Sequence, residues 1–134
     1  MAALLRSAAT LRISGDDLDP PKLSQFLCAT PTLVCVKGEP RKPGGKAIAR
    51  SGQWHLGAKD TEPADIDAQI AEILSQLPSD PDVWRSLAAH YKIDLFCGWF
   101  MNESNEGVGI SAETLSALGS RGIKLGIDLY GPVA

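Results

Sequence analysis

The segment from Lys37 to Arg50 concentrates positive charge on an otherwise acidic chain. It holds five of the thirteen lysines and arginines and one acid, Glu39, whereas the 134-residue chain has a net charge of −3. Arginine suits bidentate contacts with phosphate or carboxylate, and backbone N–H groups at Gly44 and Gly45 can approach an anion. We expect either a solvated, flexible hairpin loop or a site for an anion, a nucleotide or an acidic partner, formed by Lys37, Arg41, Lys42, Lys46 and Arg50.

This basic segment is not a phosphate-binding loop of the Walker type. The spacing from Gly38 to Gly44 differs from that motif, and Ala47 stands where the motif needs a Ser or Thr for magnesium. No predicted helix is basic, so we do not expect sequence-specific recognition of nucleic acid. The negative net charge also argues against a generic nucleic-acid binder.

A second candidate surface consists of side chains that alternate with apolar residues along the predicted strands. If helices cover the sheet face that carries Leu11, Leu95 and Leu125, the opposite face displays aromatic and charged groups. These are Arg12, His55, Asp94, Phe96, Phe100, Asp128 and Tyr130. Aromatics with a few charges are typical of a surface that binds a ligand or a protein. We expect this to be the ligand or partner face, with Phe96 and Phe100 covered in a homodimer or complex.

Three groups of this face have the chemistry for acid–base catalysis. If Asp94 and Asp128 are cross-strand neighbours, their pKa values can split, or the pair can hold a cation. Arg12 or Lys124 can instead neutralise these carboxylates as ordinary cross-strand pairs. His55 can act as a general base, but no Ser or Cys nucleophile stands at a recognisable elbow. We therefore name no catalytic residue and favour a binding role over a hydrolase-like activity.

The cysteines and histidines predict neither a disulfide framework nor a metal site. Cys28, Cys35 and Cys97 are odd in number, and their spacings of 7 and 62 contain no CxxC pair. His55 and His90 are the only histidines, so a zinc site has few ligands to recruit. We interpret the cysteines as small buried hydrophobes in a protein of the reducing cytoplasm, with no metal and no cofactor.

Hydrophobic periodicity and capping residues predict the elements that position these side chains. Strands are expected over residues 10–14, 32–37, 52–56, 93–101, 108–110 and 124–130, with a hairpin loop over residues 102–107. Helices are expected from Pro20, over residues 63–77, from Pro81 and after Ser111, with Asp19 and Ser111 as N-caps. The element order is therefore β-α-β-β-α-α-β-β-α-β.

This order predicts an α+β fold in a single domain. The sheet is expected to be mixed and largely antiparallel, with about five to six strands and helices mainly on one face. A content of 44% apolar and 22% charged residues is that of a globular core. We place the domain at residues 10–131 and expect residues 1–9 to be a flexible extension. The apolar runs are shorter than 18 residues, so no membrane span is expected.

Several short motifs occur along the chain in a recognisable order. They are Leu11–Pro20 (LRISGDDLDP), Val36–Arg41 (VKGEPR), Ser51–Trp54 (SGQW), Val83–Tyr91, Ile93–Gly98 (IDLFCG), Ile110–Ser111 and Ile127–Tyr130 (IDLY). In these motifs the chain resembles domain-of-unknown-function family 4279, a family of uncharacterised bacterial proteins, over about residues 10–131. The resemblance implies a small α+β domain. The family carries no established activity, so no catalytic role transfers.

These patterns favour a non-enzymatic binding or interaction module that uses the helix-free sheet face. Its expected occupant is a protein partner, a second copy of the chain or a small ligand. The alternative is anion or nucleotide binding through the basic loop over residues 37–50.

Overall fold

One mixed sheet with helices packed on a single side makes up the fold. The structure is a computed structural model that describes residues 2–132. The strands are β1 (Ala2–Ala3), β2 (Arg6–Gly15), β3 (Leu33–Cys35), β4 (Gly52–Gly57), β5 (Lys92–Phe100), β6 (Glu106–Gly107) and β7 (Lys124–Tyr130). The helices are α1 (Pro20–Leu27), α2 (Ile66–Leu74), α3 (Pro81–His90) and α4 (Ala112–Ser120).

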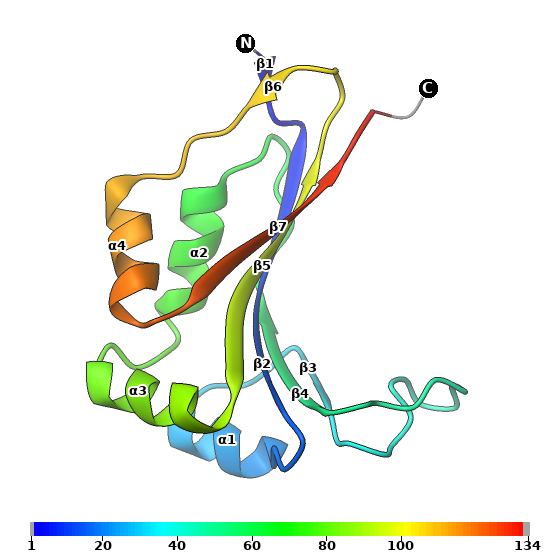
Figure 1. The fold of residues 1–134 in the computed structure, drawn as a ribbon. Helices are drawn as coiled ribbons and strands as arrows, with labels where there is room; N and C mark the ends of the chain where they lie inside the picture. The colour runs from blue at the N-terminus through cyan, green and yellow to red at the C-terminus, as the bar shows by residue number, and fades with distance from the viewer. Residues whose placement is uncertain (1, 133–134) are drawn as a thin grey trace.

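The main sheet has five strands in the order β3-β4-β2-β5-β7. Neighbouring strands are antiparallel except β5 and β7, which run parallel. The predicted α+β class with a largely antiparallel sheet is therefore confirmed. The helices all lie on one side of this sheet, and within residues 2–132 no helix covers the other side (Figure 1). Along this same stretch, every helix is too short or too polar to cross a membrane.

Alternation along the central strand explains why one sheet face is covered. Ser7, Ala9, Leu11 and Ile13 of β2 are buried, and the residues between them are only half-buried. Successive side chains of a strand point to opposite faces, so the buried set faces the helices. The helices contact successive strands of this layer: α1 contacts β4, α2 contacts β2, α3 contacts β5 and α4 contacts β7.

Tryptophan side chains anchor the core between the sheet and the helices. Trp54 and Trp84 are fully buried, and Trp99 is buried near the end of β5. The indole N–H of Trp54 donates to Ser24 Oγ at 2.9 Å, and that of Trp84 donates to the Pro78 carbonyl at 2.8 Å. These bonds satisfy the ring nitrogens of Trp54 and Trp84 and fix α1 and the turn before α3.

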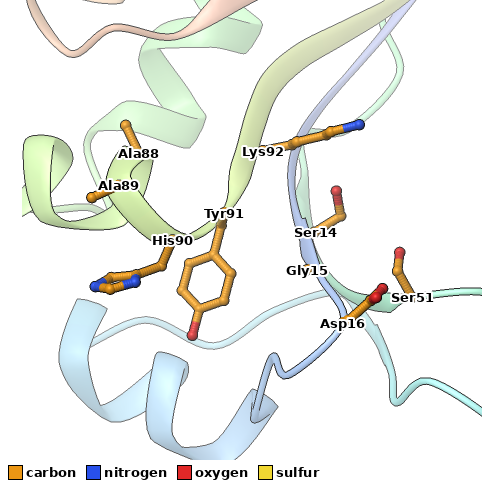
Figure 2. Close-up of a pocket in the computed structure, with 9 residues that line it drawn as sticks. All are labelled: Ser14, Gly15, Asp16, Ser51, Ala88, Ala89, His90, Tyr91 and Lys92. Atoms are coloured by element: carbon orange, nitrogen blue, oxygen red, sulfur yellow. The ribbon is translucent and has the colours of Figure 1, made fainter.

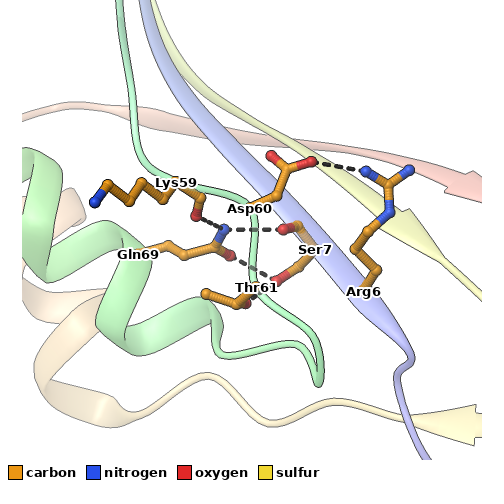
Figure 3. A network of polar contacts seen from close by, with 6 residues as sticks. All are labelled: Arg6, Ser7, Lys59, Asp60, Thr61 and Gln69. Carbon is orange, nitrogen blue, oxygen red and sulfur yellow. Dashed lines mark hydrogen bonds and ion pairs between the residues drawn. The ribbon is translucent and has the colours of Figure 1, made fainter.

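A buried glutamine ties α2 to β2 (Figure 3). Gln69 is 1% exposed. Its Oε1 accepts from Ser7 Oγ at 2.6 Å, and its Nε2 donates to the carbonyls of Ser7 at 2.9 Å and Lys59 at 2.8 Å. Ser7 and Thr61 also exchange two backbone hydrogen bonds. The amide thus holds the helix, the strand and the segment after β4 in one polar network.

The N-terminal residues enter the fold earlier than predicted. β2 begins at Arg6 rather than Thr10, so residues 6–9 belong to the central strand and not to an extension. Ala2 and Ala3 form β1, which pairs in parallel with β6.

The predicted hairpin after β5 is wrong. β6 pairs with β1 rather than with β5, and residues 108–110 are not a strand. The reason is that β5 lies between β2 and β7, so neither of its edges is free for the returning chain. The other predicted strands and helices are present: β7 has the predicted bounds and α1 and α3 the predicted starts, while other ends are shifted. For example, α2 begins only after Asp65, whose side chain accepts a hydrogen bond from the backbone N–H of Ala68.

Candidate functional site

The strand register gathers the residues predicted for the ligand or partner face. Arg12 of β2 stands between His55 of β4 and Asp94 of β5. Across the β5–β7 pair, the matching residues are Phe96 with Gly126, Gly98 with Asp128, and Phe100 with Tyr130. Directly opposed residues point to the same side of a sheet. All seven side chains therefore lie opposite the helices, on a surface that we call the open face: Arg12, His55, Asp94, Phe96, Phe100, Asp128 and Tyr130.

An ion pair occupies the middle of the open face. Arg12 Nε donates to Asp94 Oδ1 at 2.8 Å, and Nη2 donates to Oδ2 at 2.7 Å. The guanidinium also lies 4.3 Å over the ring of Phe96. The hydrogen bonds that Arg12 donates to Asp94 raise the pKa of Arg12, burial lowers it, and the charges of Asp94 and Asp128 raise it further. Asp94 is thus engaged as the structural partner of an arginine, one of the two roles considered for it.

Asp94 and Asp128 are not cross-strand neighbours, so the condition for a paired acid and base is not met. Asp94 lies opposite Lys124, whereas Asp128 lies opposite Gly98. Asp128 is four residues beyond Lys124 along β7, about 13 Å at the rise of a strand. The two carboxylates do not face one another, so the geometry gives no support to a paired acid and base.

The other end of the open face carries a stacked aromatic pair. The rings of Phe100 and Tyr130 lie 4.7 Å apart with an angle of 7° between their planes. Arg6 covers the second side of the Phe100 ring at 3.7 Å and pairs with Asp60 at 2.7 Å. Phe96 and Phe100 are half-buried, and Tyr130 is exposed. This end offers a preordered, partly apolar surface.

The surroundings of His55 favour its uncharged form. Burial lowers the pKa of His55 below 6.5, the charges of Arg12 and Arg41 lower it further, and only Asp94 raises it. The ring is held by Gln53, whose Oε1 accepts from His55 Nε2 at 3.0 Å. The field at this histidine is therefore dominated by positive charge.

The basic segment is a folded loop beside the open face. Arg41 N donates to the Ala47 carbonyl at 2.8 Å, and Ala49 N donates to the Glu39 carbonyl at 2.8 Å. Figure 1 shows that the loop between β3 and β4 projects on the side of the sheet away from the helices. The charge of Arg41 is one of the causes that lower the pKa of His55, which lies on the open face. The two candidate surfaces are thus adjacent.

Most of the loop cations have no acidic partner. Lys37 Nζ lies 3.1 Å from Asp16 Oδ2. Within residues 2–132 the other four form no ion pair: Arg41, Lys42, Lys46 and Arg50. These side chains are exposed, so their charge is available to a ligand.

A hollow of about 620 Å³ opens at the end of the open face nearest the loop. We call it the cationic hollow, and it is lined by Arg12, Ser14, Gln53, Lys92, Ile93, Asp94 and Lys124. A second hollow of about 550 Å³ lies between the end of β2 and the end of α3. It shares Ser14 and Lys92 with the cationic hollow. Figure 2 shows this second hollow, with the Lys92 side chain extending from β5 toward β2. In the described chain neither Lys92 nor Lys124 forms an ion pair.

Sequence reasoning missed Arg6, Gln53 and Lys92 as parts of this surface. Arg6 was assigned to an N-terminal extension, although it continues the alternation of β2. Lys92 precedes the predicted strand by one residue and lies opposite Ser14. Continuing the alternation of each strand outward would have placed both residues on the open face.

The cysteines and histidines do not gather into a cluster. Over residues 2–132 no group of three or more His, Cys, Asp or Glu side chains is arranged to hold a metal ion. Cys35 and Cys97 are buried, but Cys28 is exposed, contrary to the prediction. Cys28 follows the last turn of α1 in a left-handed conformation with a φ of 52°, so it is not on the apolar face of the helix.

Comparison with known proteins identifies the family but no individual relative. A family model described as a domain of unknown function (DUF4279) matches residues 5–132. No curated protein and no solved structure shows a significant match. Since the match spans nearly the whole chain, from within the N-terminal segment to the end of β7, the chain belongs to this DUF4279 family.

Proposed function

We propose that this chain is a non-enzymatic binding module that holds a small organic anion in the cationic hollow of its open face. The observation that carries the proposal is the charge of the lining. Three cations, Arg12, Lys92 and Lys124, line the hollow with a single carboxylate, and that carboxylate already accepts two hydrogen bonds from Arg12. The hollow therefore offers positive charge without a free acid to neutralise it.

Size and shape support a small ligand. Ligand pockets have volumes of about 300–1,000 Å³, and the cationic hollow has about 620 Å³. Lys92 is exposed and can contact a carboxylate or phosphate as a point charge. Ser14 and Gln53 in the same lining add neutral hydrogen-bonding groups.

The positive charges near the cationic hollow support an anionic ligand. The chain as a whole has a net charge of −3. Against this background, Arg12 and Arg41 both lower the pKa of His55, which borders the hollow through its bond to Gln53. A positive region on an acidic protein attracts anions selectively, and the attraction weakens with added salt.

The test is calorimetric titration at low ionic strength with inorganic phosphate, citrate and adenosine monophosphate. At least one of these probes is expected to bind, and Lys92→Gln is expected to weaken its binding by roughly ten- to hundredfold, because a hydrogen bond to a charged group contributes ~1.5–3 kcal/mol. Lys22→Gln is the matched control, since this lysine is 85% exposed on α1, on the helix side of the sheet. Absence of binding by all three probes, or equal binding by the Lys92 variant, would overturn the proposal.

A second candidate places the main anion contacts on the basic loop. It is favoured by the four exposed loop cations that have no acidic partner in the described residues. Here the double variant Arg41→Ala with Lys42→Ala is expected to abolish binding in the same titration, while Lys92→Gln leaves it intact. The reverse result assigns the ligand to the cationic hollow.

A further inference from the structure

The outer edge of β7 is open to another strand. β7 is the last strand of the sheet, and only β5 pairs with it among the described residues. The Tyr130 carbonyl accepts from Met101 N at 2.9 Å, so the backbone groups of Tyr130 point toward β5. Since backbone groups alternate in direction along a strand, those of Leu125, Ile127 and Leu129 point outward. The strand thus presents a row of unpaired donors and acceptors.

The side chains of this edge are also unusual for an exposed strand. Ile127 and Leu129 are 39% and 64% exposed, although they lie on the face that the helices cover elsewhere. Natural sheets protect their edges with charges, prolines or bulges. The charges of β7 are Lys124 and Asp128, which have opposite signs and share the open face.

We infer that two copies of this chain associate through antiparallel pairing of their β7 strands, with Gly126 of each copy at the two-fold axis. In this register Lys124 of each copy lies opposite Asp128 of the other, which forms two ion pairs on the open face. Leu125 of each copy lies opposite Ile127 of the other, and these residues carry the outward backbone groups that hydrogen-bond. The edge is therefore complementary to itself in charge, in apolar contact and in backbone pairing.

Other registers lose this match. With Ile127 at the axis, Lys124 faces Tyr130 and Asp128 faces Gly126, so no ion pair forms. With Asp128 at the axis, the two aspartates face one another and repel. With Gly126 at the axis, the two glycines form a non-hydrogen-bonded pair, in which the Cα atoms lie about 4.5 Å apart. Because glycine has no side chain, this close approach causes no clash.

The dimer goes beyond the proposed ligand binding. It places the cationic hollows of the two copies on one continuous surface. Directly opposed strand residues point to the same side, so the open faces of the copies join into one continuous sheet surface. Lys124 lines the cationic hollow and also contributes to this edge. Because Lys124 belongs to both sites, dimerisation is tested by the molecular mass in solution and not by ligand binding. Lys92→Gln is expected to leave this mass unchanged even if it abolishes ligand binding.

The experiment is sedimentation equilibrium combined with charge reversal at positions 124 and 128. The wild type is expected to form a species of twice the 14.2 kDa mass of the chain at micromolar concentration. Lys124→Glu and Asp128→Lys each place like charges opposite one another twice, and each is expected to weaken the dimer about tenfold or more. Asp17→Lys, an exposed acid far from β7, is the matched control and is expected to leave the dimer intact.

Two further samples show whether a single variant loses the dimer because of its charges or because it fails to fold. The double variant, with both reversals in one chain, restores opposite charges and is expected to dimerise again. A mixture of the two single variants restores opposite charges between unlike chains and is expected to yield heterodimers, although each variant alone dimerises only weakly. A monomeric wild type, or a dimer that is unaffected by the single reversals, overturns the inference.

Discussion

Arg12 and His55 are direct cross-strand neighbours in the β2–β4 pair. Burial lowers the pKa of His55, and the charge of Arg12 is the next largest cause of the shift. The histidine therefore reports on the electrostatics of the open face, and substitutions of its charged neighbours are expected to change its titration in opposite directions.

Removing either member of the central ion pair is expected to move the pKa of His55. Arg12→Gln removes a cation that lowers this pKa, so the pKa should rise. Asp94→Asn removes the acid that raises it, so the pKa should fall. Titration of the imidazole protons by NMR measures both shifts. Arg85→Gln, on the exposed side of α3, is the control, and a shift in the same direction for both open-face variants would contradict this description of the site.

Stability is expected to decrease as the pH falls below about 6.5 because of His55. Its pKa in the folded state lies below the ordinary value of 6.5, so the unfolded chain binds a proton more readily in the window between the two values. His55→Gln removes this contribution. Urea denaturation of both proteins at several pH values should show the wild type losing more free energy of unfolding than the variant between pH 7.5 and 5.5. The contribution of the carboxylates is the same in both proteins and cancels when the two free energies of unfolding are subtracted. Parallel curves of this free energy against pH would therefore refute the role given to His55.

Gln69→Leu is expected to be among the most destabilising single substitutions in α2. It leaves the Lys59 carbonyl without its partner and removes one of the two partners of both the Ser7 hydroxyl and the Ser7 carbonyl, which keep their bonds to Thr61. Gln69 is 1% exposed, and an unsatisfied buried polar group costs about 1–3 kcal/mol, so we expect a loss of this size by chemical denaturation. Gln76→Leu, at an exposed position after the same helix, should change stability by less than about 0.5 kcal/mol. A double-mutant cycle with Ser7→Ala should show coupling, and simple additivity would argue against the network.

Gly15→Ala is expected to destabilise the end of β2. A Cβ atom there would lie 2.6 Å from Tyr91 Cδ1, which is closer than side-chain atoms pack. Overpacking of this kind costs about 1–3 kcal/mol. Gly119→Ala is the matched control, because a Cβ in α4 meets no atom within 4 Å, and it should be neutral or stabilise by up to ~1 kcal/mol. Thermal unfolding of both variants distinguishes these outcomes, and equal effects would contradict the close packing of Gly15.

Of the three thiols, only Cys28 is expected to react quickly with a disulfide reagent at pH 8. It is exposed, whereas Cys35 and Cys97 are buried. Burial also raises the pKa of Cys97 to about 11, so the reactive thiolate is scarce at this pH. Cys28→Ser should remove the fast phase of the reaction, and Cys97→Ser should leave it unchanged. The opposite pattern would mean that Cys97 is accessible in solution.

Much of the site was predictable because strand alternation is a local property. Leu95 was expected on the covered side of the sheet and Cys97 was expected to be buried, and both are fully buried. The same alternation placed Phe96 and Phe100 on the other side, where the structure has them. Helix starts at Asp19 and Ser111 were also predictable, because an N-cap needs only the next few residues of the chain.

What the sequence determined by itself is therefore the identity of most elements, the face on which the residues of the longer strands lie and the positive charge of the loop. Only the tertiary structure decided which strands are neighbours and in which register. It gave Asp94 to Arg12 and separated it from Asp128, and it closed both edges of β5 so that the expected hairpin has no place. The physical reason is that periodicity depends on residues close in the chain, whereas pairing depends on which distant strand reaches a free edge first and buries the most apolar surface there.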